Sequence, residues 1–400
     1  MPGPLENIKV VEVGLWVAGP STSAILGDWG AEVIKIEPPQ GDPFRGWTAS
    51  IAGVNMPMNP PFELDNRGKR SVALNLEKDE AREIALQLIE KADVFVTNIR
   101  PRALEEFALS YEELSQRFPR LVYCQITGYG PDGPERDRAA YDIGAFWSRA
   151  GVAAALTPQG AQLPQLRGGM GDHMAGFGAA GAVCAALLAR ERTGEGQRVD
   201  VSLLRTGIYM MGWDVSLAQR MNMPIVAYDR KHAVNPLVTC YKCGDGRWLW
   251  LLLLQADRHW GDLCQAIGRE DLMADPRYEN IEMRRQNAPA LVEELDGMFA
   301  TKTLSQWGEV LDRHNVWWAP VNSINDVMTD PVAEAAGAFV QVPGPDGPTQ
   351  MVATPADFSG TPWEPRGLAP ELGQHTEEVL LELGYDWDRI VVLKENGAIP

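Results

Sequence analysis

Strand and helix patterns alternate along the first half of the chain, and this order restricts the folds that the chain can adopt. Short runs rich in Val and Ile are typical of buried strands, and the segments between them have the periodicity of helices. Parallel strands need a long crossover connection, usually a helix, so the alternation predicts a mainly parallel sheet and an α/β fold class. The predicted strands are 8–13, 32–36, 72–74, 94–97 and 121–126, and the predicted helices are 20–29, 79–91 and 175–192.

The length and the changing composition of the chain predict more than one domain. At 400 residues the chain exceeds the usual size of one domain. A methionine-rich stretch, TGIYMMGWDVSLAQRMNMP, indicates a linker, and a strand-rich stretch with a GDG turn signal follows it. The loop at 38–61, rich in Pro, Gly and Asn, is expected to line a site or an interface. We expect a large domain beginning with 1–205, a linker at 206–227, a smaller α+β domain at 228–320, a second linker at 321–345 and a final part at 346–400.

The net charge argues against two classes of partner. The chain carries a formal charge of −18, whereas binding to nucleic acid or to an anionic membrane needs a net attractive field or a large basic face. An apolar run of about 18 residues, which a membrane-spanning helix needs, is absent, and the first residues lack the pattern of a signal peptide. We therefore expect a cytoplasmic protein that binds neither nucleic acid nor membrane, and that uses local cations for any anionic ligand.

The cysteines, histidines and glycines do not indicate a metal or a nucleotide cofactor. Cys240 and Cys243 form a C-x-x-C in a predicted strand, where residues three apart point to opposite faces, and the sequence has no second such pair. The five histidines lack the spacing of a metal motif. Gly14 and Gly19 have the spacing of a phosphate-binding loop, but Pro20 stands where that loop requires Lys. A G-x-S-x-G nucleophile motif is also absent. We expect no metal and no bound cofactor.

One acidic residue in GGMGDHMAGFGAAGAV is a candidate for chemistry. Asp172 precedes the predicted helix, and Gly168, Gly169 and Gly171 leave a ligand room to approach the backbone around it. One interpretation is a helix N-cap, because Asp is favoured at that position. The other is a nucleophile, since a helix N-terminus stabilises an ionised carboxylate. Position alone favours the cap and leaves both open.

The stretch GDHMAGFGAAGAVCAALLARERTGEGQRVDVSLL resembles the central signature of the class III CoA-transferases, the family of formyl-CoA, carnitine, bile-acid and 2-hydroxyacyl CoA-transferases. The resemblance implies that Asp172 is a covalent nucleophile. It also implies transfer of CoA from a donor acyl-CoA to an acceptor acid, through an aspartyl mixed anhydride and an aspartyl-CoA thioester, with coenzyme A as co-substrate. Further similar stretches occur in the same order along the chain: VVEVGLWVAGPSTSAILGDWGAEVIKIE, LDNRGKRSVALNL, ADVFVTNIRPRALEEFALSYEEL, LVYCQITGYGPDGP, AYDIGAF, APVNSINDVMTDP and LGQHTEEVLLELGY.

The resemblance also implies an architecture and a set of ligand contacts. Two copies would interlock as a homodimer, each with a Rossmann-like large domain built from both chain ends and a small domain between two linkers. Val17 stands where the formyl-CoA enzymes have Gln, and their glycine loop has no counterpart here, so the acid is expected to be larger than oxalate. The candidates for CoA or substrate binding are Val17, Ala18, Arg67, Lys69, Arg70, Asn98, Arg100 and Gly171.

Two other functions remain open from the sequence. The α-methylacyl-CoA racemases of the same fold pair an Asp with a His that corresponds to Tyr141 in AYDIGA. A tyrosine has an ordinary pKa of about 10 and is a poor two-way base at neutral pH. Tyr141 is therefore expected to shape or polarise the thioester site, and Asp142 either caps the next helix or faces the site. The second alternative is a non-catalytic acyl-CoA binder, against which the glycine-flanked Asp172 argues.

Overall fold

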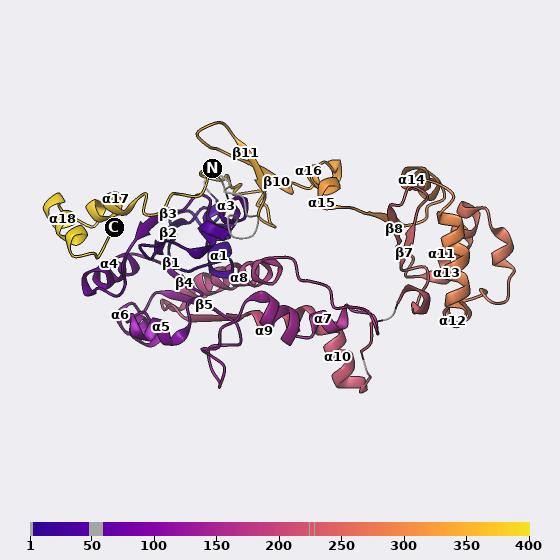
Figure 1. Ribbon diagram of the computed structural model, residues 1–400, viewed down its shortest axis with the longest axis horizontal. Coiled ribbons are helices and arrows are strands. Elements are labelled where there is room, and N and C mark those ends of the chain that lie inside the picture. The colour runs from indigo at the N-terminus through magenta and orange to yellow at the C-terminus, as the bar shows by residue number, and fades with distance from the viewer. Residues whose placement is uncertain (1–2, 48–58, 224, 228) are drawn as a thin grey trace. The chain divides into compact units, whose positions relative to one another are not determined.

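The computed structural model describes residues 3–47, 59–223, 225–227 and 229–400 of the chain. They belong to two compact units, and Figure 1 labels many of their helices and strands. Residues 48–58 of the predicted loop, and Pro224 and Tyr228 near the predicted start of the small domain, lie outside the described residues. The domain boundaries expected from the sequence stay a prediction. The larger unit comprises Met1–Ala153, Gln165–Met223 and Gly337–Pro400, and the smaller one comprises Ala154–Pro164 and Pro224–Ala336.

Six parallel strands form the centre of the larger unit (Figure 1). They lie in the order β3-β2-β1-β4-β5-β6, and every neighbouring pair is parallel. The predicted parallel sheet is thus confirmed, and its strand order is that of a doubly wound Rossmann-type sheet. In this order, β2 and β3 are added on one side of β1, and β4, β5 and β6 on the other. The strands are β1 (Lys9–Val13), β2 (Glu32–Glu37), β3 (Arg70–Ala73), β4 (Val94–Thr97), β5 (Val122–Thr127) and β6 (Arg198–Ser202).

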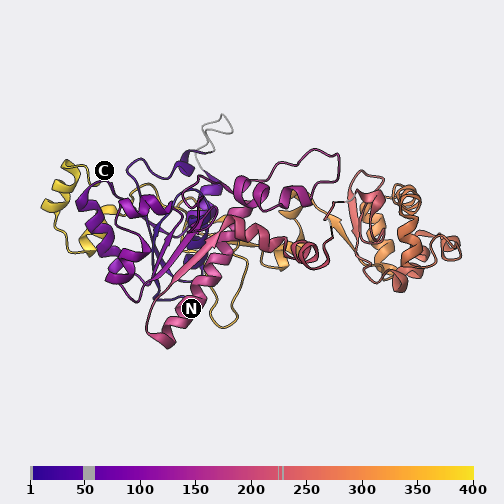
Figure 2. The same cartoon turned by 90° about the horizontal axis from the view of Figure 1, so that it is seen from below.

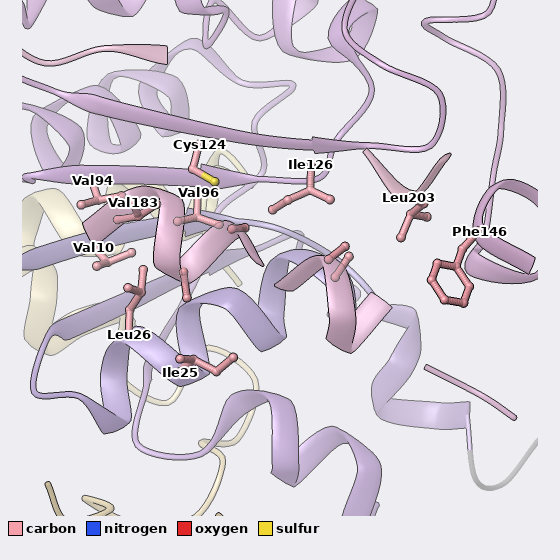
Figure 3. Close-up of a cluster of buried hydrophobic side chains, with 14 of the residues drawn as sticks. Val10, Ile25, Leu26, Val94, Val96, Cys124, Ile126, Phe146, Val183 and Leu203 are labelled. Atoms are coloured by element: carbon pink, nitrogen blue, oxygen red, sulfur yellow. The ribbon is translucent and has the colours of Figure 1, made fainter. Parts of the chain in front are cut away.

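Both faces of this sheet are apolar, because successive strand residues point to opposite sides and helices cover both. On one side, Val10, Val96 and Cys124 pack in a cluster with helices α1 (Ala18–Asp28) and α8 (Met170–Thr193) (Figure 3). Figure 2 shows the long helix α8 running beside the strands, where it contacts β5 and β6. This side of the sheet carries the helix that holds Asp172.

The opposite side of the sheet is covered by helices from distant parts of the sequence. Val11 and Phe95 form one cluster with Leu88 and with Val379 and Ile390 from the last part of the chain. Residues about 300 positions apart therefore build one core, so this layer depends on long-range contacts. Its helices are α4 (Asp79–Glu90), α5 (Pro101–Glu106), α6 (Tyr111–Arg117), α17 (Thr376–Glu382) and α18 (Trp387–Glu395).

Short elements connect these layers in the larger unit. Helices α9 and α10 occupy most of the segment 206–227 that the sequence predicted as a linker. An antiparallel hairpin, β10 with β11, precedes the C-terminal helices. The connecting elements are η1 (Pro43–Gly46), α3 (Pro60–Asn66), the π-helix η2 (Ile143–Arg149), α7 (Val152–Ala155), α9 (Leu203–Met210), α10 (Gly212–Met221), β10 (Phe339–Val342) and β11 (Thr349–Val352).

The smaller unit is an antiparallel sheet of order β7-β8-β9 with helices packed on one face. Leu249 and Leu251 point into its core while Trp250 between them is exposed, as in a half-buried strand. Cys243 is buried and Cys240 half-buried, and both are free thiols. The elements are η3 (Arg230–His232), β7 (Cys240–Lys242), β8 (Trp248–Leu251), α11 (Ala256–Ile267), η4 (Glu270–Met273), α12 (Ile281–Gln286), α13 (Ala288–Phe299), α14 (Leu304–Arg313), β9 (Trp318–Val321), α15 (Ile324–Val327) and α16 (Pro331–Ala335).

Helix α8 begins five residues earlier than the sequence predicted, at Met170 instead of Ala175. Its N-cap is Gly169, which has a φ of +75° that glycine adopts without strain. Asp172 therefore lies inside the first helical turn. The earlier start moves this carboxylate from the end of a loop onto a rigid element.

Helix α8 packs closely on α1 through its small residues. A Cβ atom at Gly176 would overlap Ser21 Oγ and would lie 3.3 Å from the Ala18 carbonyl oxygen. By length and composition α8 is the one helix among the described residues that could cross a membrane. Its buried alanines belong to the main core cluster of the larger unit, as expected of a core helix.

Candidate active site

A cavity of about 320 Å³ lies at the carboxyl ends of β1 and β4, where the strand order reverses. In open α/β sheets this is the usual position of a ligand, because the two neighbouring loops diverge there. The loops that follow β1 and β4, the end of β5 and the segment before η2 supply its walls, and α8 supplies one carboxylate. The lining includes Leu15, Trp16, Val17, Ala18, Asn98, Ile99, Arg100, Thr127, Arg136, Arg138, Tyr141 and Asp172.

Asn98 holds the first strand-helix turn in place. Its Oδ1 accepts a hydrogen bond from the Leu15 N–H at 2.9 Å, and its Nδ2 donates to the Leu15 carbonyl oxygen at 2.7 Å. A Cβ atom at Gly19 would lie 3.0 Å from the same Oδ1, so glycine lets the amide approach the start of α1. The predicted contact residues Val17 and Ala18 form this turn and line the cavity. Asn98 lines the cavity too, although its amide is engaged by the backbone.

Asp172 does not cap its helix. The N-cap is Gly169, and α8 has no side-chain cap hydrogen bond. The carboxylate of Asp172 lines the cavity and accepts no hydrogen bond within the described part of the chain. Asp142 takes the capping role instead, since its Oδ2 accepts from the Gly171 N–H at 3.3 Å. The cap interpretation of Asp172 is therefore wrong. Asp142 stands at the N-cap of η2, the next helix, but its side chain makes no cap hydrogen bond there and bonds to the first turn of α8 instead.

The environment of Asp172 makes its carboxyl a weaker acid than usual. Burial, and then the negative charge of Asp142, raise the pKa of Asp172 to about 7; His173 opposes the rise and Asp65 adds to it. A carboxylate that is incompletely solvated is a stronger nucleophile than one in water, because less hydration must be lost before attack. A carboxyl group with a strongly raised pKa in a cavity is also typical of a functional site.

His173, the residue after Asp172, is joined to a different helix. Its Nε2 lies 2.9 Å from Oδ1 of Asp65 in α3, and the Asp65 carboxylate is buried. Burial alone would lower the pKa of the imidazole, but the hydrogen bond and the charge of Asp65 raise it above its ordinary value. Neither residue was among the site candidates predicted from the sequence, although both lie in stretches that carry the resemblance, LDNRGKRS and GDHMAG.

Tyr141 forms part of an aromatic wall of the cavity. Its ring meets Trp16 edge to face, with 5.6 Å between the ring centroids. Trp16 has a φ of +62°, which is uncommon for a residue with a side chain, and its N–H donates to Asp42 Oδ1 at 3.0 Å. The Tyr141 side chain is 59% exposed. The ring and hydroxyl of Tyr141 are therefore available to a ligand, as its predicted role requires.

Three arginines line the cavity, although the chain as a whole is acidic. Arg100 is exposed, and its side chain forms no hydrogen bond or ion pair with any described residue. Arg136 is paired with Glu105 and Asp137. Arg138, paired with Glu135, and Arg136 were missed by the sequence analysis; the basic pair in PERDRAAYD, just before Tyr141, was the available signal.

The other predicted cations are held by internal partners. The Arg67 guanidinium contacts Asp28 at 2.5 Å and donates to the Val352 carbonyl oxygen at 2.8 Å. Arg70 pairs with Glu378 and Glu382 on α17. Neither arginine lines the cavity. Their assignment to CoA stays a prediction, and in the structure both side chains form ion pairs with carboxylates of the same chain.

Lys69 and Gly171 are buried beside the cavity instead of lining it. The Lys69 ammonium donates to Glu12 at 2.7 Å and to the Pro20 carbonyl oxygen at 2.8 Å. A Cβ atom at Gly171 would lie 2.6 Å from the Phe146 ring, so only glycine lets α8 approach η2 this closely. Both positions support the elements that carry the cavity walls.

The comparison with known families decides the class of the protein. The sequence model described as "CoA-transferase family III" matches residues 5–376. The chain belongs to CoA-transferase family III. The transferase is 37% identical over 398 residues to the (R)-2-hydroxy-4-methylpentanoate CoA-transferase of Clostridioides difficile, with 99% of each chain covered. It is 32% identical over 399 residues to the cinnamoyl-CoA:phenyllactate CoA-transferase of Clostridium sporogenes, covering 98% of this chain and 97% of that one.

A solved structure agrees with this assignment. The crystal structure of a CAIB/BAIF family protein from Brucella suis superposes on the transferase with a TM-score of 0.85 and 28% identity, covering 96% of this chain and 100% of that one. The expected resemblance and enzyme class are confirmed. The transferase is an enzyme of class III, and its relatives act on acyl-CoA thioesters and carboxylic acids.

Proposed function

We propose that the transferase moves CoA between two carboxylic acids through covalent intermediates on Asp172. The observation that carries this proposal is the position of the carboxylate: it lines the cavity at the sheet switch point, on a rigid helix, and no hydrogen bond from the described residues engages it. A nucleophile of this kind has to be positioned and partly desolvated to attack a thioester. The racemase alternative has Tyr141 where a histidine base is needed, and so lacks that base.

The proposed reaction proceeds in four steps. An Asp172 oxygen attacks the thioester carbonyl of the donor, and the carbon–sulfur bond breaks. CoA leaves as the thiolate, and a mixed anhydride of Asp172 and the donor acid remains. The thiolate then attacks the Asp172 acyl carbon, which releases the donor acid and forms an aspartyl-CoA thioester. The acceptor carboxylate attacks that thioester and releases the thiolate again. The thiolate finally attacks the acceptor carbonyl, which forms the new acyl-CoA and frees Asp172.

The cavity charges support an anionic ligand such as CoA. Arg100 is exposed at the cavity without a partner among the described residues, and Arg136 and Arg138 stand beside it. The first turn of α1, with free backbone N–H groups, borders the same cavity. We assign the CoA phosphates to this cationic side, and no metal or further cofactor to the reaction. Arg67, Lys69 and Arg70 act in this proposal as supports for the site.

The acid is proposed to be a 2-hydroxy acid with a branched or aromatic side chain, larger than oxalate. The relatives from the two clostridia are named for 4-methylpentanoate and phenyllactate substrates. In this chain the acyl side of the cavity presents the Trp16 and Tyr141 rings, and apolar Val17 stands where the formyl-CoA enzymes have Gln. An aromatic and apolar wall suits such a side chain and offers little to a second carboxylate.

An interlocked homodimer in the cytoplasm is the proposed state of the transferase. Large apolar side chains are exposed on α9 and α10, with Tyr209 86% and Trp213 81% exposed. Surfaces of this composition mark protein interfaces. A second copy of the chain is the proposed partner, with no nucleic acid or membrane involved.

Mass spectrometry of trapped intermediates tests the proposed function. The transferase is incubated with acetyl-, succinyl- or cinnamoyl-CoA and hydroxylamine, beside Asp172→Ala and the control Asp132→Ala, an exposed aspartate outside the cavity. We expect a CoA thioester or a hydroxamate on the peptide that holds Asp172, in the wild type and the control only. Deuterium exchange at the α-carbon of a branched acyl-CoA, without an adduct, would establish racemase chemistry. Binding with neither result would leave an acyl-CoA binder.

A further inference from the structure

An ion pair between the buried carboxylate of Asp65 and the partly exposed imidazole of His173 joins the nucleophile helix to a neighbouring element. The imidazole of His173 lies in the first turn of α8, directly after Asp172, and its Nε2 is 2.9 Å from Oδ1 of Asp65 in α3. The backbone of Asp65 is fixed by Lys69, whose Nζ donates to the Asp65 carbonyl oxygen at 2.6 Å. The ring of His173 also lies against Gly169, where a Cβ atom would stand 3.3 Å from its Cε1. The imidazole therefore has a fixed position.

We propose that Asp65 and His173 are positioning residues that keep a positively charged imidazole next to Asp172, so that the Asp172 carboxylate is ionised when the thioester arrives. The inference rests on the proposed covalent role of Asp172. His173 acts here through its charge. Its Nε2 is occupied by Asp65, and no hydrogen bond joins its ring to the Asp172 carboxylate.

The charges around the nucleophile make such a cation necessary. Asp142 and Asp65 are both carboxylates, and each raises the pKa of Asp172, whereas His173 lowers it. The ammonium groups of Lys35 and Lys69 are buried and both contact the Glu12 carboxylate, at 2.8 and 2.7 Å, and Lys35 also contacts the Asp42 carboxylate at 3.1 Å. Their charge is thus largely neutralised before it reaches the cavity. His173 supplies the positive charge that the nucleophile lacks.

The pairing with Asp65 explains why the imidazole carries that charge. Burial alone would favour the neutral ring, but the hydrogen bond and the charge of Asp65 raise the pKa of His173. The pairing therefore favours the protonated imidazole, while the Asp172 carboxyl, with a pKa raised to about 7, is partly ionised at neutral pH. The charged groups that act on this pair from the packed elements are Asp65 (α3), Asp142 (before η2), Asp172 (α8), Lys35 (β2) and Lys69 (before β3).

The pH dependence of turnover tests the proposal. In His173→Gln the amide nitrogen replaces Nε2 and can still donate to Asp65, but the charge is lost. We expect the rising limb of log kcat/KM for the acyl-CoA to move to higher pH by about one unit, since a nearby opposite charge shifts a carboxyl pKa by about that much or more. Turnover below the limb should fall about tenfold. At high pH, where the Asp172 carboxyl is ionised in both proteins, the two profiles should converge.

Two further variants separate charge from structure. His173→Lys restores a cation and should return the limb toward the wild-type position, and Asp65→Asn should lower the pKa of His173 measured by NMR. The His173 resonance is identified among the five histidines by its loss in His173→Gln. His232, which pairs with Asp229 at 2.9 Å in the smaller unit, supplies the control His232→Gln. If His173→Gln lost turnover equally at every pH, the proposal would be overturned, and the contact between His173 and Asp65 would have only a structural role.

Hydroxamate trapping on Asp172 keeps this test apart from the test of the proposed function. If wild-type protein forms the adduct and His173→Gln forms it with an unshifted pH dependence, the positioning role fails and the covalent role stands. If the wild type forms no adduct at any pH, the covalent role itself fails.

Discussion

The contact between α1 and α8 gives the sharpest prediction about this fold, because the N-termini of both helices lie at the cavity. A methyl group at Gly176 would overlap Ser21 Oγ on α1 and would lie 3.3 Å from the Ala18 carbonyl oxygen. One neighbour is a side chain that can rotate and the other is backbone that cannot. Gly176→Ala should therefore force the two helices apart.

The magnitude follows from two opposing terms. Overpacking a tight contact costs about 1–3 kcal/mol, and replacing Gly by Ala inside a helix returns up to about 1 kcal/mol. We expect Gly176→Ala to lower the free energy of unfolding by about 1–2 kcal/mol, from the difference of these terms. Because α8 carries Asp172 and α1 begins at the cavity wall, kcat/KM should fall as well.

Urea unfolding and initial rates measure these two effects. The matched control is Gly178→Ala on the same helix, where a Cβ atom meets nothing within 4 Å, so that only the helix-propensity gain remains. Ser21→Ala removes the overlapping hydroxyl, and combining it with Gly176→Ala should recover part of the lost stability. Equal unfolding free energies for the Gly176 and Gly178 variants would refute the reasoning.

Three further predictions concern the charges of the site. The proposed attack by the Asp172 carboxylate, whose pKa is raised to about 7, predicts that log kcat/KM falls by about one unit per pH unit below that value. A flat profile across this range would contradict the proposal. Glu12→Gln leaves two buried ammonium groups without their shared carboxylate, so urea titration should show a loss of about 3–5 kcal/mol, and an unchanged midpoint with an unchanged slope would refute it. Arg100→Ala should raise KM for acyl-CoA by about tenfold at low salt, as expected for the loss of a charge-assisted phosphate contact. The control Arg70→Ala, whose glutamate partners lie outside the cavity, should leave KM unchanged. Equal effects of the two substitutions on KM would exclude the assignment of Arg100 to CoA.

The parallel sheet could be predicted because its strands carry their own signal. β1 to β5 are short, largely buried runs rich in β-branched or aromatic residues, and helical patterns follow them, whereas β6 is only half-buried. The identity of Asp172 as a candidate could also be predicted, from its glycine neighbours and from the resemblance. These features are local in the sequence, so no knowledge of distant contacts is needed to recognise them.

The start of α8 could not be predicted in the same way. Gly169 and Gly171 have low helix propensity, so the sequence favours a loop up to Ala175. The helix nevertheless starts at Met170, because Asp142 from another element accepts the Gly171 N–H and Gly171 packs on Phe146. Tertiary contacts of this kind override propensity, and they moved Asp172 from a predicted cap position into the first turn.

The predicted cations show the same limit for the site. Arg67 and Lys69 were assigned to CoA because the stretch LDNRGKRS resembles the CoA-transferase family. Their partners, Asp28 and Glu12, lie 39 and 57 residues away along the chain, so the pairing is invisible before folding. Arg100 came from the same reasoning and has no such partner among the described residues. A cation motif thus predicts where positive charge gathers, but not which charges remain available.

This division of the charges has a physical basis in the cavity. A paired, buried cation resists motion, and so it suits the support of the β1 turn and of α3, where Lys35 and Lys69 share Glu12. An exposed, unpaired arginine has little desolvation to lose when a phosphate arrives, which suits ligand capture. His173 combines both properties, because it is fixed by Asp65 and yet its charge acts on Asp172. In the proposed mechanism the site uses three kinds of cation, and only the freely exposed kind should respond to added salt.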